Sequence, residues 1–200
     1  MDLTDIAMYC KIKQSKQEAD EYKQKADTYE SILTGEVTEF VIPENWTVLR
    51  PGVFKNCKKL KNITIPSNIT LIGATAFNQC TMLKTIEIPN SVTIIEYSAF
   101  YSCTSLTNIT IPSSVTSMGI TMFTNCSRLT NVTLGNNFNC NGLDLSSSTR
   151  YSVDTLVAML TALADRTGQT AYTLTIGTTN LAKLSDEQKA IATDKNWTLA

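Results

Sequence analysis

The chain has 200 residues, 42% of them hydrophobic, and 17 basic side chains nearly balance 18 acidic ones to give a net charge of −1. This balance argues against nucleic acid or an anionic membrane surface as a partner, and no apolar run approaches the roughly 18–20 residues of a transmembrane helix. Histidine is absent, which removes the commonest general base and metal ligand. We therefore expect neither an enzyme nor a cofactor.

Residues 1–36 are predicted to form a helical stalk or attachment segment, because 3–33 lack proline and Gly35 follows as a helix-stopping residue. Apolar or small side chains recur there in alternating steps of four and three, which is typical of a coiled coil. The expected oligomerisation residues are Ile12, Ala19, Tyr22, Ala26, Tyr29 and Leu33. We expect a homo-oligomer, with a trimer favoured. The alternatives are a solvated or disordered tail, or a helix folded back on the rest of the chain.

Residues 37–142 contain a 23-residue repeat. Its clearest phrase is Phe-x-x-Cys, with phenylalanines at Phe54, Phe77, Phe100 and Phe123 and cysteines at Cys57, Cys80, Cys103 and Cys126. A leucine stands three residues after each cysteine, and a partial unit begins at Val37. A strict period of this length predicts a solenoid of stacked coils, because each unit needs its neighbours to cover its apolar faces.

Each unit contains an alternating phrase such as Ile86-Glu-Ile88, followed in three units by proline. The alternation predicts a short strand with the isoleucines inward, and the proline ends it. A second short strand is expected at the Ile-Thr-x-Ile phrase, with a turn at Gly73 or Gly119 and with Glu96 in the glycine's place in the middle unit.

The outward positions of the first strand form a polar stripe along the predicted sheet. The stripe consists of Asn62, Thr64, Thr85, Glu87, Asn108, Thr110, Asn131 and Thr133. One interpretation is a recognition surface for a protein or a glycan. The other is a solvated face made of polar residues that favour strands.

The four repeated cysteines lie at one position per coil, so they predict a straight ladder with the ~4.8 Å spacing of neighbouring strands. Such a ladder is neither a tetrahedral metal cage nor a convenient geometry for disulfides. We interpret these cysteines as small buried side chains in a turn, with disulfides and a metal site as the alternatives.

The 23-residue repeat does not continue in residues 143–200. We expect strands at Leu143–Leu145, Tyr172–Ile176 and Trp197–Leu199, a helix capped by Ser152 and running through Arg166, and a helix opened by a capping box at Ser185 and reaching about Asp194. This order fits larger leucine-rich units that continue the same sheet as a C-terminal cap.

The stretch 111–133, Ile-Pro-Ser-Ser-Val-Thr-Ser-Met-Gly followed by Phe-Thr-Asn-Cys-Ser-Arg-Leu-Thr-Asn-Val-Thr, resembles the BspA-like leucine-rich-repeat family of the Treponema type. The resemblance covers about half of the chain. It implies an α/β solenoid with a parallel sheet along one face. It also implies a surface or secreted protein with a role in adhesion or binding and without catalytic residues.

The runs from Ile176 to Gln188 and from Ile191 to Leu199 resemble the tails of repeat proteins from gut bacteria and their phages. The N-terminus lacks the basic and long apolar regions of a signal peptide. We therefore expect a non-enzymatic virion protein, as a fibre, tail or head-decoration protein, that binds a host-surface protein or glycan or other virion proteins. The alternative is a bacterial or protist adhesion protein that reaches the cell surface by a non-classical route.

Overall fold

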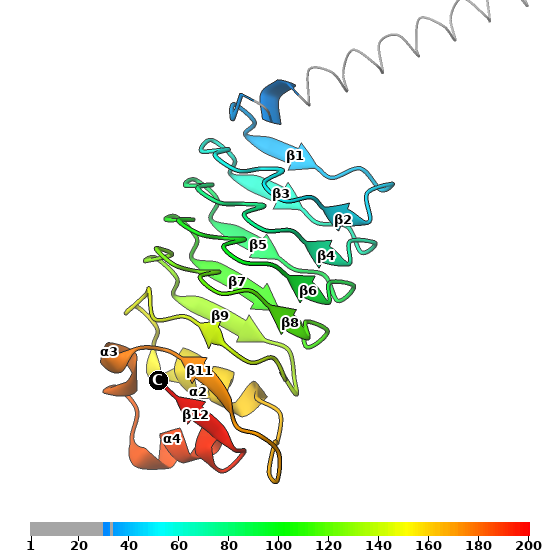
Figure 1. Cartoon of the computed structure of the whole chain (residues 1–200). Coiled ribbons are helices and arrows are strands. Elements are labelled where there is room, and N and C mark those ends of the chain that lie inside the picture. The colour runs from blue at the N-terminus through cyan, green and yellow to red at the C-terminus, as the bar shows by residue number, and fades with distance from the viewer. Residues whose placement is uncertain (1–29, 33) are drawn as a thin grey trace, which may run out of the picture.

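The computed structural model describes residues 30–32 and 34–200, which form a stack of coils followed by a smaller C-terminal unit (Figure 1). The short strands of the stack form two rows along the solenoid, and neighbouring strands within a row run parallel. The first row consists of β1 (Glu39–Val41), β3 (Asn62–Thr64), β5 (Thr85–Glu87), β7 (Asn108–Ile111) and β9 (Asn131–Leu134). The second row consists of β2 (Val48–Leu49), β4 (Leu71–Ile72), β6 (Ile94–Ile95) and β8 (Ser117–Met118).

The strands pair in a register of 23 residues, as the repeat predicts. Ile86 lies opposite Ile109, and Ile109 lies opposite Val132, while Val48 pairs with Leu71 in the second row. Hydrogen bonding is continuous along the second row. In the first row, β1 and β3 form one ladder and β5, β7 and β9 another, with β3 beside β5. The alternating pattern therefore places the inward isoleucines in one core.

The centre of the core is a stack of aromatic rings. Phe54, Phe77, Phe100 and Phe123 are almost wholly buried. Successive rings lie 5.3–5.5 Å apart between centroids, with planes within 10° of parallel. At the N-terminal end Phe40 contacts Phe54 edge-on at 5.1 Å. The repeated phenylalanine thus fills one column through the coils.

The repeated cysteines are free thiols, and all four are buried. Three of the thiols donate a hydrogen bond to a backbone carbonyl of the preceding coil: Cys80 to Phe54, Cys103 to Phe77 and Cys126 to Phe100, each at 3.1 Å from Sγ to O. The fourth, Cys57, donates to Ile32 O at 3.6 Å. Their interpretation as small buried side chains is confirmed, and they form no disulfides. Burial raises the pKa of Cys57 to about 11 and that of Cys126 to about 12, so these thiols stay protonated.

The turn from each second-row strand to the next first-row strand uses two left-handed backbone positions. The first, two residues before the phenylalanine, has φ between +53° and +67° at Gly52, Thr75, Ser98 and Thr121. The second, directly before the cysteine, has φ between +57° and +65° at Asn56, Gln79, Ser102 and Asn125. This conformation turns the chain sharply, and backbone amides in the turn then bond to the next coil, as from Phe54 N–H to Ala76 O at 2.8 Å.

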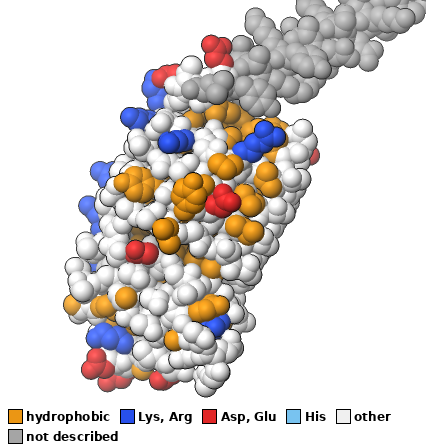
Figure 2. Space-filling view, viewed as in Figure 1, with side chains coloured by type: hydrophobic (Ala, Val, Ile, Leu, Met, Phe, Trp, Pro, Cys, Tyr) orange, Lys and Arg blue, Asp and Glu red, His pale blue; other side chains and the backbone are white. Residues whose placement is uncertain are grey.

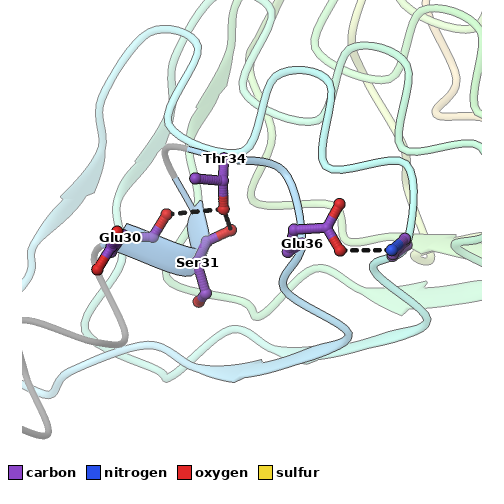
Figure 3. A network of polar contacts seen from close by, with 5 residues as sticks. Glu30, Ser31, Thr34 and Glu36 are labelled. Atoms are coloured by element: carbon purple, nitrogen blue, oxygen red, sulfur yellow. Dashed lines mark hydrogen bonds and ion pairs between the residues drawn. The ribbon is translucent and has the colours of Figure 1, made fainter.

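The N-terminal end of the stack is joined to a helical turn at 30–32, and Gly35 follows it with φ of +74°. Figure 3 shows Thr34, whose hydroxyl donates to the carbonyls of Glu30 and Ser31 at 2.9 and 3.3 Å, and Glu36, which pairs with Lys59 of the next coil. The expected stop at Gly35 is confirmed. The expected oligomerisation residues Ile12, Ala19, Tyr22, Ala26, Tyr29 and Leu33 lie outside the described residues.

The C-terminal unit contains β10 (Leu143–Asp144), α2 (Val153–Ala162), β11 (Tyr172–Thr175), α3 (Thr178–Leu181), α4 (Asp186–Thr193) and β12 (Trp197–Leu199). Its three strands form a separate parallel sheet in the order β10-β11-β12, so they do not extend a hydrogen-bonded row of the stack as expected. Helix α2 packs instead beside β9, the last strand of the first row. The capping box at Ser185 is present, with Gln188 N–H donating to Ser185 Oγ at 3.2 Å.

The expected helix through Arg166 is too long by four residues, because α2 ends at Ala162. Leu163 leaves the helix in an extended conformation and pairs with Phe138, whose N–H donates to Ala162 O at 2.9 Å and whose carbonyl accepts from Ala164 N–H at 3.0 Å. A tertiary strand pairing therefore replaces the last helical turn. Within residues 30–32 and 34–200, no helix has both the length and the apolar character needed to cross a bilayer.

Candidate recognition groove

The eight residues of the predicted polar stripe lie together on the outer side of the first row. All of them are exposed, whereas the residue between each pair is turned inward. They line one open groove of about 500 Å³ that runs across β3, β5, β7 and β9. The structure thus brings every candidate binding residue into one continuous surface, which from here is called the groove.

Backbone register fixes the side chains of the groove in parallel columns. Thr85 lies opposite Asn108, and Asn108 opposite Asn131, while Glu87, Thr110 and Thr133 form the second column. The side-chain N–H of exposed Asn108 donates to Thr107 Oγ1 at 2.9 Å, and its side-chain carbonyl oxygen remains available as an acceptor. The groove therefore offers repeated amide and hydroxyl groups at the spacing of neighbouring strands, ~4.8 Å.

The chemistry of the groove is that of hydrogen bonding. Glu87 is the only ionisable side chain among the described residues that line it. A single carboxylate supplies no acid–base pair, and no serine or cysteine nucleophile lies in the lining. Elsewhere in the described part of the chain, no three Cys, Asp or Glu residues are grouped to hold a metal ion.

The stripe begins one coil earlier than the sequence interpretation placed it. Glu39 pairs in register with Asn62 and accepts a hydrogen bond from its amide at 2.9 Å, and Val41, which is 82% exposed, lies opposite Thr64. The signal was present in the sequence, because Phe40 aligns with Ile63 and so places Glu39 and Val41 at outward positions.

The outer side of the second row carries exposed hydrophobic side chains, in contrast to the polar groove. Val48, Leu71 and Ile94 follow one another in register, and Val48 and Ile94 are 38% and 37% exposed. Figure 2 shows hydrophobic side chains gathered over this row. Sequence reasoning missed this feature, although Val48 and Ile94 stand directly before the inward residue of each short strand.

Solved leucine-rich-repeat proteins resemble this chain. The T. pallidum leucine-rich-repeat protein is 20% identical with a TM-score of 0.54, over 82% of this chain and 85% of that one. The pneumococcal vaccine antigen PcpA is 27% identical with a TM-score of 0.51, over 54% of this chain and 26% of the antigen. A leucine-rich cell surface protein from Faecalibacterium prausnitzii is 30% identical with a TM-score of 0.45, over 49% and 32%.

The chain therefore spans about a third of the F. prausnitzii protein and about a quarter of PcpA. None of the curated protein sequences matches it significantly. The model of the BspA-type leucine-rich repeat region matches residues 28–144 in six copies, which is more than half of the chain. With the 23-residue register and the two rows of parallel strands, this match places the chain in the BspA-type leucine-rich-repeat family, a family of surface and binding proteins.

Proposed function

We propose that this chain is a non-enzymatic recognition protein that binds a host-surface protein or glycan through the groove. The observation that carries the proposal is that all eight stripe residues line one open groove. Amide and hydroxyl groups fixed on a rigid sheet lose little conformational entropy on binding, so their hydrogen bonds contribute to affinity more fully than those of a mobile loop.

The test is a bulky substitution in the middle of the groove. Thr110→Tyr places a large side chain at an exposed strand position, where tyrosine is well tolerated. Ser117→Tyr is the matched control, because Ser117 is an exposed strand residue of the second row. Glycan arrays and binding to intact host cells should show loss of binding for Thr110→Tyr and unchanged binding for Ser117→Tyr. Equal binding by both variants would overturn the proposal.

We propose the virion as the first setting for this protein, as a fibre, tail or head-decoration protein held by an N-terminal stalk. Support comes from the heptad spacing and from the resemblance of the C-terminal tail to phage-associated repeat proteins. The second setting is a bacterial or protist cell surface, which membership of a family of surface and binding proteins favours. Labelling with an antibody distinguishes them: purified virions bind the antibody in the first setting, and intact producing cells bind it in the second.

The stalk is tested in the full chain. Ala19→Asp with Ala26→Asp places charges on the heptad seam, whereas Gln17→Asp with Gln24→Asp places the same charges off it. If the N-terminal segment trimerises through the seam, light scattering should show a monomer for the first pair and a trimer for the second. A wild-type monomer would contradict the stalk while leaving the groove untouched.

We also propose that residues 143–200 close the open C-terminal end of the core. Helix α2 packs beside β9, and its Leu156, Met159 and Leu160 are buried. At the far side of the unit, Trp197 is 2% exposed and donates from Nε1 to Ala164 O at 2.9 Å. Trp197→Ala should therefore destabilise the whole stack and not only the C-terminal unit, because a solenoid needs its ends covered. Hydrogen exchange of the β7 and β9 amides measures this, and unchanged exchange there would contradict the cap.

A further inference from the structure

Charge is distributed unevenly along the solenoid. Between residues 50 and 84 there are six basic residues and no acidic one, whereas between 85 and 127 there are two acidic residues and no basic one. All six basic side chains are exposed: Arg50, Lys55, Lys58, Lys59, Lys61 and Lys84. The first coil adds three acidic residues, Glu36, Glu39 and Glu44, so residues 36–84 carry six basic and three acidic side chains, and the near-neutral total of the chain conceals this local positive excess.

Four of these lysines lie on the turns that lead into the first row and are here called the basic edge: Lys58, Lys59, Lys61 and Lys84. Lys61 directly precedes Asn62 and Lys84 directly precedes Thr85, and both of these neighbours line the groove. Figure 2 shows basic side chains along the left margin of the upper coils. The basic edge therefore borders the groove at the end where its strands begin.

Most of this charge is unneutralised. Lys59 pairs with Glu36, but among the described residues no acidic side chain pairs with Lys58, Lys61 or Lys84. Lys61 and Lys84 occupy the same position in adjacent coils, whose strands β3 and β5 lie side by side. Like charges on neighbouring coils repel each other, and a bound anion would relieve the repulsion.

The repeat itself shows that the fold does not require lysine at this position. In the next two coils the same position is threonine, and each threonine hydroxyl donates to the preceding coil: Thr107 to Lys84 O at 3.1 Å and Thr130 to Thr107 O at 3.3 Å. Lys61 lacks this side-chain bond but keeps a backbone one, from its N–H to Thr38 O at 2.8 Å. Lysine at 61 and 84 is thus not explained by stability.

We infer that the ligand of the groove is an acidic polysaccharide, whose anionic groups lie on the basic edge while its hydroxyl groups lie in the groove; this inference rests on the proposed function. The lining of the groove contains no aromatic ring. A neutral sugar would therefore bind only through hydrogen bonds. Each of these replaces a hydrogen bond to water, so its net contribution to affinity is small. Nucleic acid is disfavoured because its bases need aromatic surfaces for stacking, and the lining of the groove supplies none.

The experiment measures binding of the full chain to heparin and to hyaluronan by calorimetry, with neutral dextran and single-stranded oligo-dT as comparison polymers. The test variant is Lys61→Thr with Lys84→Thr, which uses the residue that the repeat itself carries at 107 and 130. The control is Lys55→Gln with Arg150→Gln, which removes two exposed basic residues outside the basic edge.

We expect the wild type to bind at least one acidic polysaccharide and not dextran. The test variant should bind about tenfold more weakly at low salt, because it loses two ion pairs that are each exposed and partly screened by solvent. The affinity of the control variant should stay within about twofold of that of the wild type. Thermal unfolding of the test variant should be unchanged or slightly raised. Thr110→Tyr should also weaken binding.

Other outcomes overturn the inference in distinguishable ways. Equal losses in test and control variants would show non-specific charge attraction, and oligo-dT binding as tight as heparin binding would show a nucleic-acid site. If Thr110→Tyr abolishes binding of dextran or of host cells while the lysine variant binds normally, the acidic ligand is wrong and the groove function stands. If the lysine variant loses heparin but Thr110→Tyr does not, the groove is not the site and both proposals fail.

Discussion

The phenylalanine column predicts that contact between rings, in addition to burial, stabilises the middle coils. Phe100 is fully buried and stacks on Phe77 and Phe123, with centroids 5.4 and 5.5 Å away and planes within 6° of parallel. Phe138 is equally buried, but within the described part of the chain it stacks with no other ring. Phe100→Leu and Phe138→Leu therefore differ in ring contacts and not in burial.

The magnitude follows from these contacts. Each substitution removes a few buried carbon atoms, which costs about 1–2 kcal/mol of the free energy of unfolding. Phe100→Leu also loses two ring contacts at about 0.5–1.5 kcal/mol each. It should therefore destabilise the protein by about 1–3 kcal/mol more than Phe138→Leu. Urea unfolding followed by far-UV circular dichroism measures both values on the full chain.

A double-mutant cycle separates the ring contact from the burial. Phe100→Leu combined with Phe123→Leu should show a coupling free energy of about 0.5–1.5 kcal/mol, because the two rings touch each other. Equal destabilisation by Phe100→Leu and Phe138→Leu, together with additive effects in the cycle, would refute the reasoning. The rings would then act only as apolar filling for the coils.

Three further predictions concern the turns, the thiols and the C-terminal unit. Thr75→Asn should raise the free energy of unfolding by about 0.5–1 kcal/mol, because a β-branched residue is strained at φ of +56°. A lower free energy of unfolding, measured by urea unfolding, would contradict this prediction. Ser185→Ala should cost about 1 kcal/mol by removing the capping box of α4, and an unchanged urea midpoint would contradict that. Burial raises the pKa of Cys126 to about 12, well above that of a solvent-exposed thiol. Stability should therefore be flat below about pH 8 and fall above pH 9, because the unfolded thiols ionise first, and Cys126→Ala should show a smaller fall over pH 9–11.

The 23-residue period predicted the repeat fold well, because in a solenoid every coil has the same neighbours. Once Phe77 and Phe100 are aligned, the strand positions, the inward isoleucines and the outward stripe all follow from strand alternation alone. The structure agrees at each point, as in the register of Glu87 with Thr110. Local pattern and tertiary contact carry the same information in this part of the chain.

Some of the features that were missed depend on contacts that no local pattern encodes. The thiol of Cys103 bonds to a carbonyl 26 residues earlier, a separation set by how the coils stack. Glu96 replaces the turn glycine because its carboxylate accepts the Ala74 N–H at 2.7 Å in the preceding coil. Helix α3 follows Gly177, which has φ of +78°, and was not expected because it contains only four residues.

The coils share one backbone scheme, so the differences between their surfaces are not required by the fold. The inward positions scarcely vary. Phenylalanine, cysteine and leucine recur because close packing against the neighbouring coils allows only a side chain of one size and shape at each position. The outward positions have no such constraint, yet they are not mixed at random. One row presents amides and hydroxyls in a groove, the other presents Val48, Leu71 and Ile94, and the lysines are confined to the first coils. Solvation alone would be satisfied by any polar residue on either row. The segregation of three chemistries on one repeated scaffold therefore points to selection on the surface, and it directs the search for a ligand to the groove and its basic edge.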